Sequence, residues 1–228
     1  MSAALTGKTV VVTGASIGIG REIALQLAAE GCRLALSYRE HRAEADEVAA
    51  RCREAGAPDV LVAPLELADD ASAEAFVEAV GDRFGVVDVL VNNAGVVVWG
   101  RFREQTYADI ERQIAVNLTG TVKLTWAMLP LVREAVVFIG STAALHGTAT
   151  LAPYCASKWG LRGFAKALAK EHRDLRVVSV HPTVTATRMN DFRGMAPEKV
   201  AGVVVKVLRG EIEAASGDDV DVRQHVPE

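Results

Sequence analysis

A tyrosine and a lysine stand four residues apart in the stretch PYCASKWG, as Tyr154 and Lys158. On a helix, residues at this spacing share one face about one turn apart. A free phenol has a pKa of about 10 and exchanges protons poorly at neutral pH, but a neighbouring ammonium group stabilises the phenolate and lowers that pKa. The pair could therefore give a proton to a carbonyl oxygen or take one from an alcohol. Any helix can carry this spacing by chance, so the interpretation depends on what surrounds it.

Two other polar residues could belong to the same site. Ser141 follows the apolar run AVVFIGS, which reads as a buried strand, so it is expected at the carboxyl edge of a parallel sheet, where ligands bind in such folds. Asn117 lies within an expected long helix, although asparagine is a poor helix former because its side chain competes for backbone hydrogen bonds. On residue type alone, Asn117 could equally be a buried structural amide.

The elements that would position these residues alternate between short β-branched runs and helical stretches. Strands are expected at 8–14, 33–38, 59–65, 87–93 and 135–141, and helices at 20–31, 42–56 and 71–85. Apolar runs without strict alternation suit strands that are buried on both faces. The pattern predicts an α/β fold, a single-domain doubly wound parallel β-sheet of the Rossmann type with helices on both faces, spanning residues 1–228.

The second half of the chain extends this pattern. Long helices are expected from Tyr107 to Arg133 and from Pro153 to His172, a strand at 176–182 and a last helix at 197–208. The final 18 residues, from Glu211, are weakly patterned, with at most one short strand around Val220 to Val222.

The first strand runs into a glycine-rich turn, TGASIGIG, with glycines at 14, 18 and 20. Glycines let a backbone approach a pyrophosphate, and the free N–H groups of a helix N-terminus favour its negative charge. The spacing G-x-x-x-G-x-G resembles that of the short-chain dehydrogenase/reductase family, of the ordinary single-domain type similar to 3-oxoacyl-carrier-protein reductases. The resemblance covers residues 6 to about 190 and includes several motifs in the family's order.

The resemblance implies roles for the polar residues. Tyr154 would be the general acid and base, Lys158 would tune it and hold the nicotinamide ribose, and Ser141 would hydrogen-bond the substrate oxygen. Asn117 would hold a local kink and a water that connects the lysine to solvent. Gly140 stands where the family more often has serine, a substitution expected to be harmless, and His181 is expected to be a core or strand-end residue rather than a catalyst.

The same resemblance assigns the cofactor contacts. Glu66 and Leu67 fall where the family has an acid and an aliphatic residue beside the adenine, and Thr183 replaces a usual glycine, which puts the backbone freedom of that turn in question. The complete expected set is Gly14, Ser16, Ile17, Gly18, Ile19, Gly20, Tyr38, Arg39, Glu66, Leu67, Asn93, Ala94, Gly95, Tyr154, Lys158, Pro182, Thr183, Val184, Thr185 and Thr187.

The end of the second expected strand bears on the choice between NADP(H) and NAD(H). NAD-preferring relatives usually have an aspartate at position 38, whereas this chain has Tyr38 followed by Arg39. A guanidinium attracts a 2′-phosphate and a carboxylate repels it, so NADP(H) is favoured over NAD(H). Against this, Ile17 replaces a second basic residue and Glu40 follows directly, and Arg39 could instead be a solvated surface charge.

Composition narrows the classes of function. A net charge of −4 gives no case for nucleic acid, and no run of apolar residues is long enough for a membrane span, which together with the start MSAALTGKT favours a cytoplasmic protein. Three scattered cysteines without a CxxC pair suggest neither a disulfide framework nor a metal site.

We therefore expect an NADP(H)-dependent oxidoreductase that acts on a small-molecule carbonyl or secondary alcohol. The alternative is a non-catalytic dinucleotide-binding redox sensor or scaffold with the same fold, which would not need the proton chemistry. An epimerase or dehydratase of the extended type fits poorly, because the chain is too short for an additional substrate domain.

Substrate identity is not encoded in any recognisable motif. Only nine residues separate Thr187 from Pro197, which implies a minimal lid over the pocket. Val97, Trp99, Ala143, His146 and Thr148 are candidate pocket residues, with ordinary loop packing an equal alternative. A homodimer through the long helices at 107–133 and 153–172 is expected, or a homotetramer if the last strand also takes part.

Overall fold

A parallel β-sheet forms the centre of the protein. The structure is a computed structural model and describes residues 4–226, within which the sheet has the order β3-β2-β1-β4-β5-β6-β7. The strands are β1 Thr9–Val12, β2 Arg33–Tyr38, β3 Val60–Pro64, β4 Val87–Asn92, β5 Val132–Ile139, β6 Arg176–His181 and β7 Asp219–Asp221. The strand order reverses between β1 and β4, so the loops that follow these two strands diverge and leave a crevice at the carboxyl edge.

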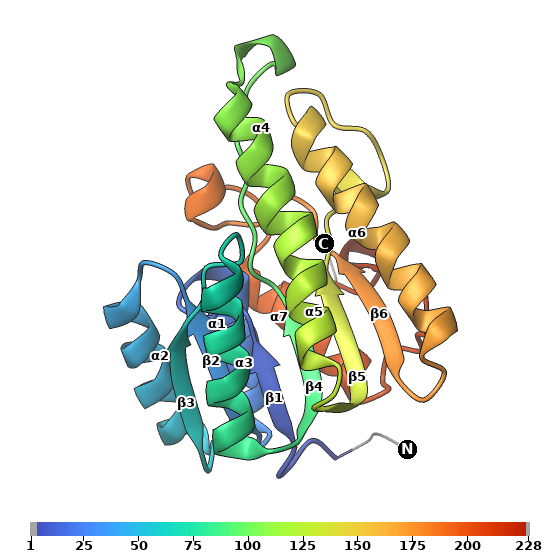
Figure 1. Ribbon diagram of the computed structural model, residues 1–228. Coiled ribbons are helices and arrows are strands. Elements are labelled where there is room, and N and C mark those ends of the chain that lie inside the picture. Colours follow the sequence, from blue (N-terminus) through green and yellow to red (C-terminus); the bar gives the residue numbers. More distant parts are fainter. Residues whose placement is uncertain (1–3, 227–228) are drawn as a thin grey trace.

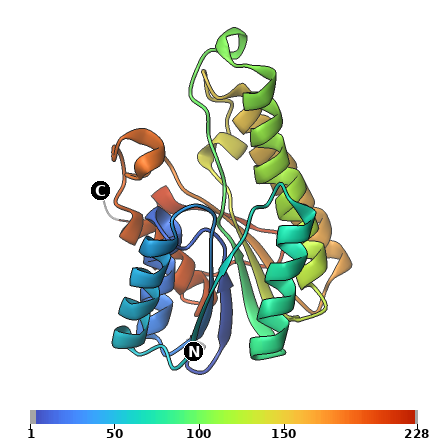
Figure 2. The same ribbon diagram turned by 60° about the vertical axis from the view of Figure 1, so that its left-hand side comes forward.

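Helices cover both faces of the sheet, as Figure 2 shows. One layer contains α1 Gly18–Ala29, α2 Arg42–Ala55 and α7 Pro197–Leu208, and the other contains α3 Asp70–Phe84, α4 Tyr107–Ile114, α5 Thr121–Met128 and α6 Ala152–Glu171. The short 3₁₀ helices are η1 Phe102–Glu104, η3 Thr142–Ala144, η4 Arg188–Asn190 and η5 Val222–Gln224, and η2 Ala115–Gly120 is a π-helix. The fold is thus the Rossmann-type α/β architecture that the alternating pattern predicts.

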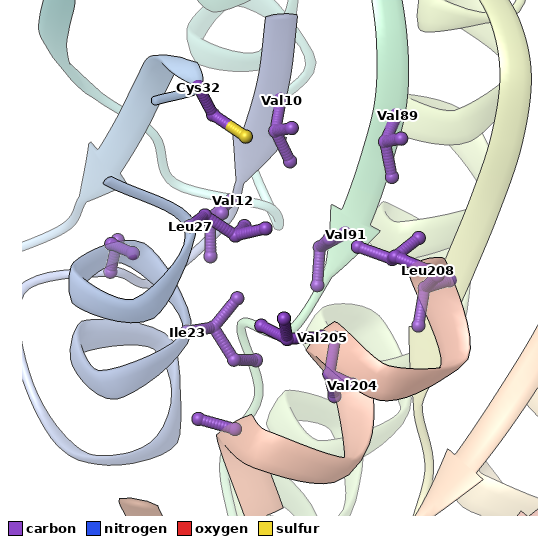
Figure 3. Packing of buried hydrophobic residues seen from close by; sticks show 14 of the residues in the cluster. Val10, Val12, Ile23, Leu27, Cys32, Val89, Val91, Val204, Val205 and Leu208 are labelled. Carbon is purple, nitrogen blue, oxygen red and sulfur yellow. The ribbon is translucent and has the colours of Figure 1, made fainter. Parts of the chain in front are cut away.

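Each central strand contributes to two hydrophobic cores. Val10 and Val12 of β1 face α1 and α7, where they join a cluster that includes Ile23 and Leu27 (Figure 3). Val11 points the opposite way, into the core beneath α3, α5 and α6. Since successive strand residues point to opposite faces, both cores require apolar side chains, which explains the uninterrupted valine runs.

The expected helix from Tyr107 to Arg133 is wrong at its C-terminal end. Figure 1 shows α4 and α5 as one continuous rod, joined by the π-helix η2, but the helix ends at Met128 and Val132 already begins β5. Pro130 explains the ending, because proline has no N–H to continue the hydrogen-bond ladder. The expected helices at 153–172 and 197–208 and the short last strand are confirmed to within one residue.

No helix among residues 4–226 is both long enough and apolar enough to cross a lipid bilayer. The same part of the chain contains no cluster of three or more His, Cys, Asp or Glu side chains placed to hold a metal ion.

Candidate active site

The glycine turn after β1 has a conformation that needs glycine. Gly14 and Gly18 have φ of +64° and +59°, the left-handed region that side chains disfavour. A Cβ at Gly20 would lie 2.3 Å from the Gly14 carbonyl oxygen. Helix α1 has no side-chain hydrogen bond at its N-cap, Ile17, and no acidic residue in its first turn. Its first N–H groups therefore suit an anionic ligand such as a pyrophosphate.

The loop after β4 is tied to this turn by hydrogen bonds. The Asn93 side chain donates to the carbonyl oxygens of Thr13 (2.8 Å) and Gly14 (3.1 Å). The Thr13 hydroxyl in turn accepts from the backbone N–H groups of Asn93 and Ala94, both at 2.9 Å. A Cβ on Gly14 would come within 3.0 Å of the Ala94 Cα, so the two loops approach as closely as their small residues allow.

Charged side chains surround the end of β2. Arg39 donates to Glu40 Oε1 at 2.5 Å and its Nε lies 3.7 Å from Glu66 Oε2, so it is not a free surface charge. The Arg42 guanidinium lies over the Tyr38 ring at 6.0 Å and donates to its hydroxyl at 3.4 Å. Arg39 lines the crevice at this end, and Arg42 lies just outside it, at a position that the family's motifs do not include.

Helix α6 carries Tyr154 and Lys158 on one face, with the Lys158 Nζ 5.8 Å from the centroid of the tyrosine ring. The lysine is 5% exposed and donates to the carbonyl oxygen of Ile139 at 2.9 Å. Burial lowers the pKa of Lys158 to about 8. Burial also disfavours the charged form of Tyr154, and for a phenol this raises the pKa, to about 12. A hydrogen bond with Ser141 acts in the opposite direction.

In the protein without a cofactor the pKa of Tyr154 is therefore raised and not lowered. The desolvation of the phenolate outweighs the favourable contacts, because Lys158 directs its ammonium to Ile139 and lies several ångströms from the ring. The phenol is therefore protonated at neutral pH, which is the form needed for a proton donor.

Ser141 lies directly after β5 and starts η3, where its Oγ accepts from the N–H of Ala143 at 3.1 Å. Together with Tyr154 it faces the crevice, as the expected placement at the carboxyl edge requires. Gly140, which stands in place of the family's serine, packs directly against His181: a Cβ there would lie 2.4 Å from His181 Nδ1, so glycine fits this position where a side chain would clash.

Asn117 is fully buried in the π-helix η2 and does not line the crevice. Its Oδ1 accepts from the N–H of Val96 at 2.7 Å, and its Nδ2 donates to the Val96 carbonyl at 2.8 Å and to Ser157 Oγ at 3.1 Å. Both amide hydrogens and the amide oxygen are thus engaged within the protein. The side chain therefore joins the loop after β4 to α6.

The segment after β6 closes the crevice. Thr187 caps η4 by accepting from the N–H of Met189 at 3.3 Å, and its Cγ2 would be 3.1 Å from a Cβ on Gly18. Thr183, which replaces a glycine, has no positive φ, so the turn does not need glycine here. The Trp99 indole N–H donates to the Met189 carbonyl at 3.0 Å and joins the short lid to the loop after β4.

These elements enclose one cavity of ≈ 390 Å³. Its wall contains every expected cofactor residue except Gly20, which lies behind it against Gly14, and the expected Tyr154, Lys158 and Ser141. Among the candidate pocket residues, Val97, Trp99, Ala143 and Thr148 line the cavity and His146 does not. Lining residues that no sequence motif indicated include His41, Thr142, Leu151 and Met189, which lie in loops or in short 3₁₀ helices.

The residues present fit a dinucleotide cofactor. At one end of the cavity lies a glycine turn with no room for a Cβ, followed by a helix N-terminus that has no side-chain cap. At the other end lie a phenol, a hydroxyl and an ammonium group. The fold and this arrangement define a Rossmann-type dinucleotide-binding protein.

Comparison with known proteins identifies the family. The model of the short chain dehydrogenase family matches residues 8–197, and the chain belongs to that family of oxidoreductases. The chain is 36% identical to dehydrogenase/reductase SDR family member 7 of Mus musculus over 98% of its own length, and spans 64% of the length of that relative. It is 33% identical to the 3-oxoacyl-[acyl-carrier-protein] reductase of Synechocystis sp., with 88% of this chain and 89% of the relative covered. A short chain dehydrogenase from Burkholderia cenocepacia, solved in complex with NADP, superimposes with a TM-score of 0.89 at 30% identity, covering 96% of this chain and 97% of the other.

Proposed function

We propose that the protein is an NADP(H)-dependent reductase of a small carbonyl compound, or a dehydrogenase of the corresponding alcohol. The main support for this proposal is that a single cavity is lined both by Tyr154 and Ser141 and by the glycine turn that precedes α1. A dinucleotide lying along the cavity from that turn would bring its nicotinamide end to these two residues. When bound, the nicotinamide would supply or accept the hydride.

Tyr154 is proposed as the proton donor in the reducing direction. Its raised pKa keeps the phenol protonated, and the hydrogen bond with Ser141 directs it towards the place of the substrate oxygen. Ser141 would donate to the same oxygen and stabilise its developing charge. In the oxidising direction Tyr154 must lose its proton first, which requires additional positive charge near the phenol.

Lys158 is proposed to supply part of that charge and to bind the ribose of the cofactor. It is buried beside Gly95, where a Cβ would approach its Nζ to 3.6 Å. Since its pKa of about 8 lies above neutrality, most of the molecules carry the ammonium form at pH 7.

NADP(H) is proposed over NAD(H) because Arg39 lines the cavity at the end of β2, and no carboxylate occupies position 38. The ion pairs of Arg39 with Glu40 and Glu66 compete with a 2′-phosphate, so the preference is a balance of charges. Relatives have a second basic residue where this chain has Ile17. Arg42, which lies against Tyr38, would supply that second positive charge instead.

The test is a panel of ketones, aldehydes and secondary alcohols, followed by the absorbance of reduced nicotinamide with NADP(H) and with NAD(H). We expect turnover with at least one carbonyl and a lower KM for NADPH than for NADH. No turnover with any compound, combined with tight dinucleotide binding, would instead favour a redox sensor or scaffold. A preference for NADH would refute the role given to Arg39.

Two further proposals concern organisation. The chain is proposed to act as a single domain, and to form a homodimer through α4, α5 and α6. Tyr107, Trp126 and Trp159 support this surface, since all three are large, exposed and located on these helices. Light scattering after gel filtration, compared between wild type and Trp126→Glu, measures the oligomeric state and would show a monomer for the variant.

A further inference from the structure

His181 at the end of β6 is buried in contact with Ser141. Its ring is 0% exposed, and Nδ1 lies 3.3 Å from the backbone nitrogen and 3.1 Å from the carbonyl oxygen of Ser141. The ring occupies the space next to Gly140, where a Cβ would lie 2.4 Å from Nδ1. The absence of a side chain at position 140 therefore allows the imidazole to reach the serine backbone.

Asp219 of β7 holds the other side of the same ring. Its Oδ1 lies 2.9 Å from His181 Nε2, and its Oδ2 accepts from Arg162 Nε and Nη2, at 2.9 and 2.7 Å, and lies 2.9 Å from Lys166 Nζ. These contacts hold the pKa of the Asp219 carboxyl well below its usual range, so it is ionised. A continuous row of polar contacts thus runs from α6 through β7 and β6 to Ser141.

The ionised carboxylate fixes the tautomer of the imidazole. A carboxylate only accepts hydrogen bonds, so Nε2 of His181 must carry a proton and donate it to Asp219. Burial lowers the pKa of His181, which favours the neutral ring with a bare Nδ1. A bare Nδ1 accepts from the N–H of Ser141, 3.3 Å away, whereas the carbonyl oxygen of Ser141, 3.1 Å away, would be the partner of a protonated Nδ1.

We propose that His181, oriented by Asp219, is a positioning residue that fixes the peptide of Ser141 and thereby the hydroxyl that faces the substrate. The proposal rests on the function proposed above for Ser141. His181 does not line the cavity, so it acts through the serine and not on the substrate. Small displacements of a group that stabilises a transition state lower kcat more than they change binding.

Two replacements of His181 separate this role from simple packing. In His181→Asn the side-chain amide stands where Nδ1 was and can still meet Ser141, but it is too short to reach Asp219. In His181→Gln the amide extends to the position of Nε2 and can still donate to Asp219, but nothing replaces Nδ1. Both remove the ring from the same buried site, and asparagine leaves the larger cavity, so a loss of packing alone would affect His181→Asn at least as much as His181→Gln. His172→Gln, a histidine at the end of α6 away from the cavity, is the control.

We expect His181→Gln to lower kcat by about ten- to a hundredfold with an unchanged KM for the cofactor, and His181→Asn to retain most of the activity. Equal kcat values for the two variants, or a wild-type kcat in His181→Gln, would overturn the proposal. The thermal midpoint of each variant is measured alongside, so that a loss of folded protein is not counted as a loss of catalysis.

Nitrogen NMR gives a readout that does not require turnover. At neutral pH we expect the wild-type His181 ring to be protonated at Nε2 and bare at Nδ1; a proton on Nδ1 in the neutral ring would contradict the proposal even if neither variant folds. The amide signal of Ser141 should move in His181→Gln and much less in His181→Asn. If wild type turns over no carbonyl, the function proposed for Ser141 fails, while these two NMR results still decide whether His181 fixes its peptide.

Discussion

Replacing Asn117 with alanine should destabilise the protein strongly although the residue does not itself line the cavity. The substitution removes three hydrogen bonds, two with the backbone of Val96 and one with Ser157. Each is worth about 1 kcal/mol net, so we expect the free energy of unfolding to fall by about 3 kcal/mol. For a chain of this size that corresponds to a thermal midpoint lower by about 6–12 °C.

The assay is thermal and urea unfolding followed by circular dichroism, with Glu111→Ala on the exposed side of α4 as control. The control should change the free energy of unfolding by less than about 0.5 kcal/mol. If Asn117→Ala changes it by less than about 1 kcal/mol, the hydrogen bonds to Val96 do not hold the loop as described.

Asn117→Asp tests the same contacts through pH. The new carboxyl can mimic the amide only when protonated, since the Val96 carbonyl needs a donor. Burial raises the pKa of this carboxyl in the folded state above its unfolded value of about 3.9. The variant therefore keeps the stabilising contacts below about pH 3.9 and loses them as the pH rises through the folded-state pKa. A deficit relative to wild type that does not shrink on acidification would contradict this reasoning.

Three further predictions concern the cofactor end and the phenol. Gly20→Ala should lower the free energy of unfolding by about 1–3 kcal/mol and weaken dinucleotide binding, because its Cβ would lie 2.3 Å from the Gly14 carbonyl oxygen. Calorimetry measures both effects, and the matched control is Gly163→Ala, where a Cβ would meet nothing within 4 Å. Arg39→Ala should raise the dissociation constant for NADPH by about ten- to a hundredfold and leave that for NADH unchanged, measured by fluorescence titration; equal effects on both cofactors would refute a contact with the 2′-phosphate. Because the pKa of Tyr154 is about 12 in the free protein, the rise of phenolate absorbance below about pH 11 should be the same in wild type and Tyr154→Phe; a smaller rise in the variant would show that the phenol ionises earlier.

The fold was predictable because its pattern is local. The valine runs of β1 and β4 follow from burial on both faces of the sheet. The helical spacing of apolar residues in the segments between them follows from burial on one face. The end of α5 was missed because hydrophobic periodicity continues through Leu129 and Leu131, and Pro130 outweighs it.

The site was predictable where a motif fixes the backbone and missed where chain segments meet only in space. The glycine turn and the Tyr154–Lys158 pair are short-range patterns. The contact of His181 with Ser141 joins residues 40 positions apart, and that of His181 with Asp219 joins residues 38 apart, so no local pattern could reveal them. The desolvation that raises the pKa of Tyr154 was likewise not predictable, since it depends on how the folded chain surrounds the ring.

The central claim is that Tyr154 transfers the proton while hydride passes between nicotinamide and carbonyl. The most direct measurement compares Tyr154→Phe with wild type in kcat and in the dissociation constant for NADPH. We expect kcat to fall by about 10²–10⁴-fold while cofactor binding is unchanged, because the substitution removes only the acidic hydroxyl. A variant that keeps its kcat, or one that loses activity only because it no longer binds NADPH, would contradict the account.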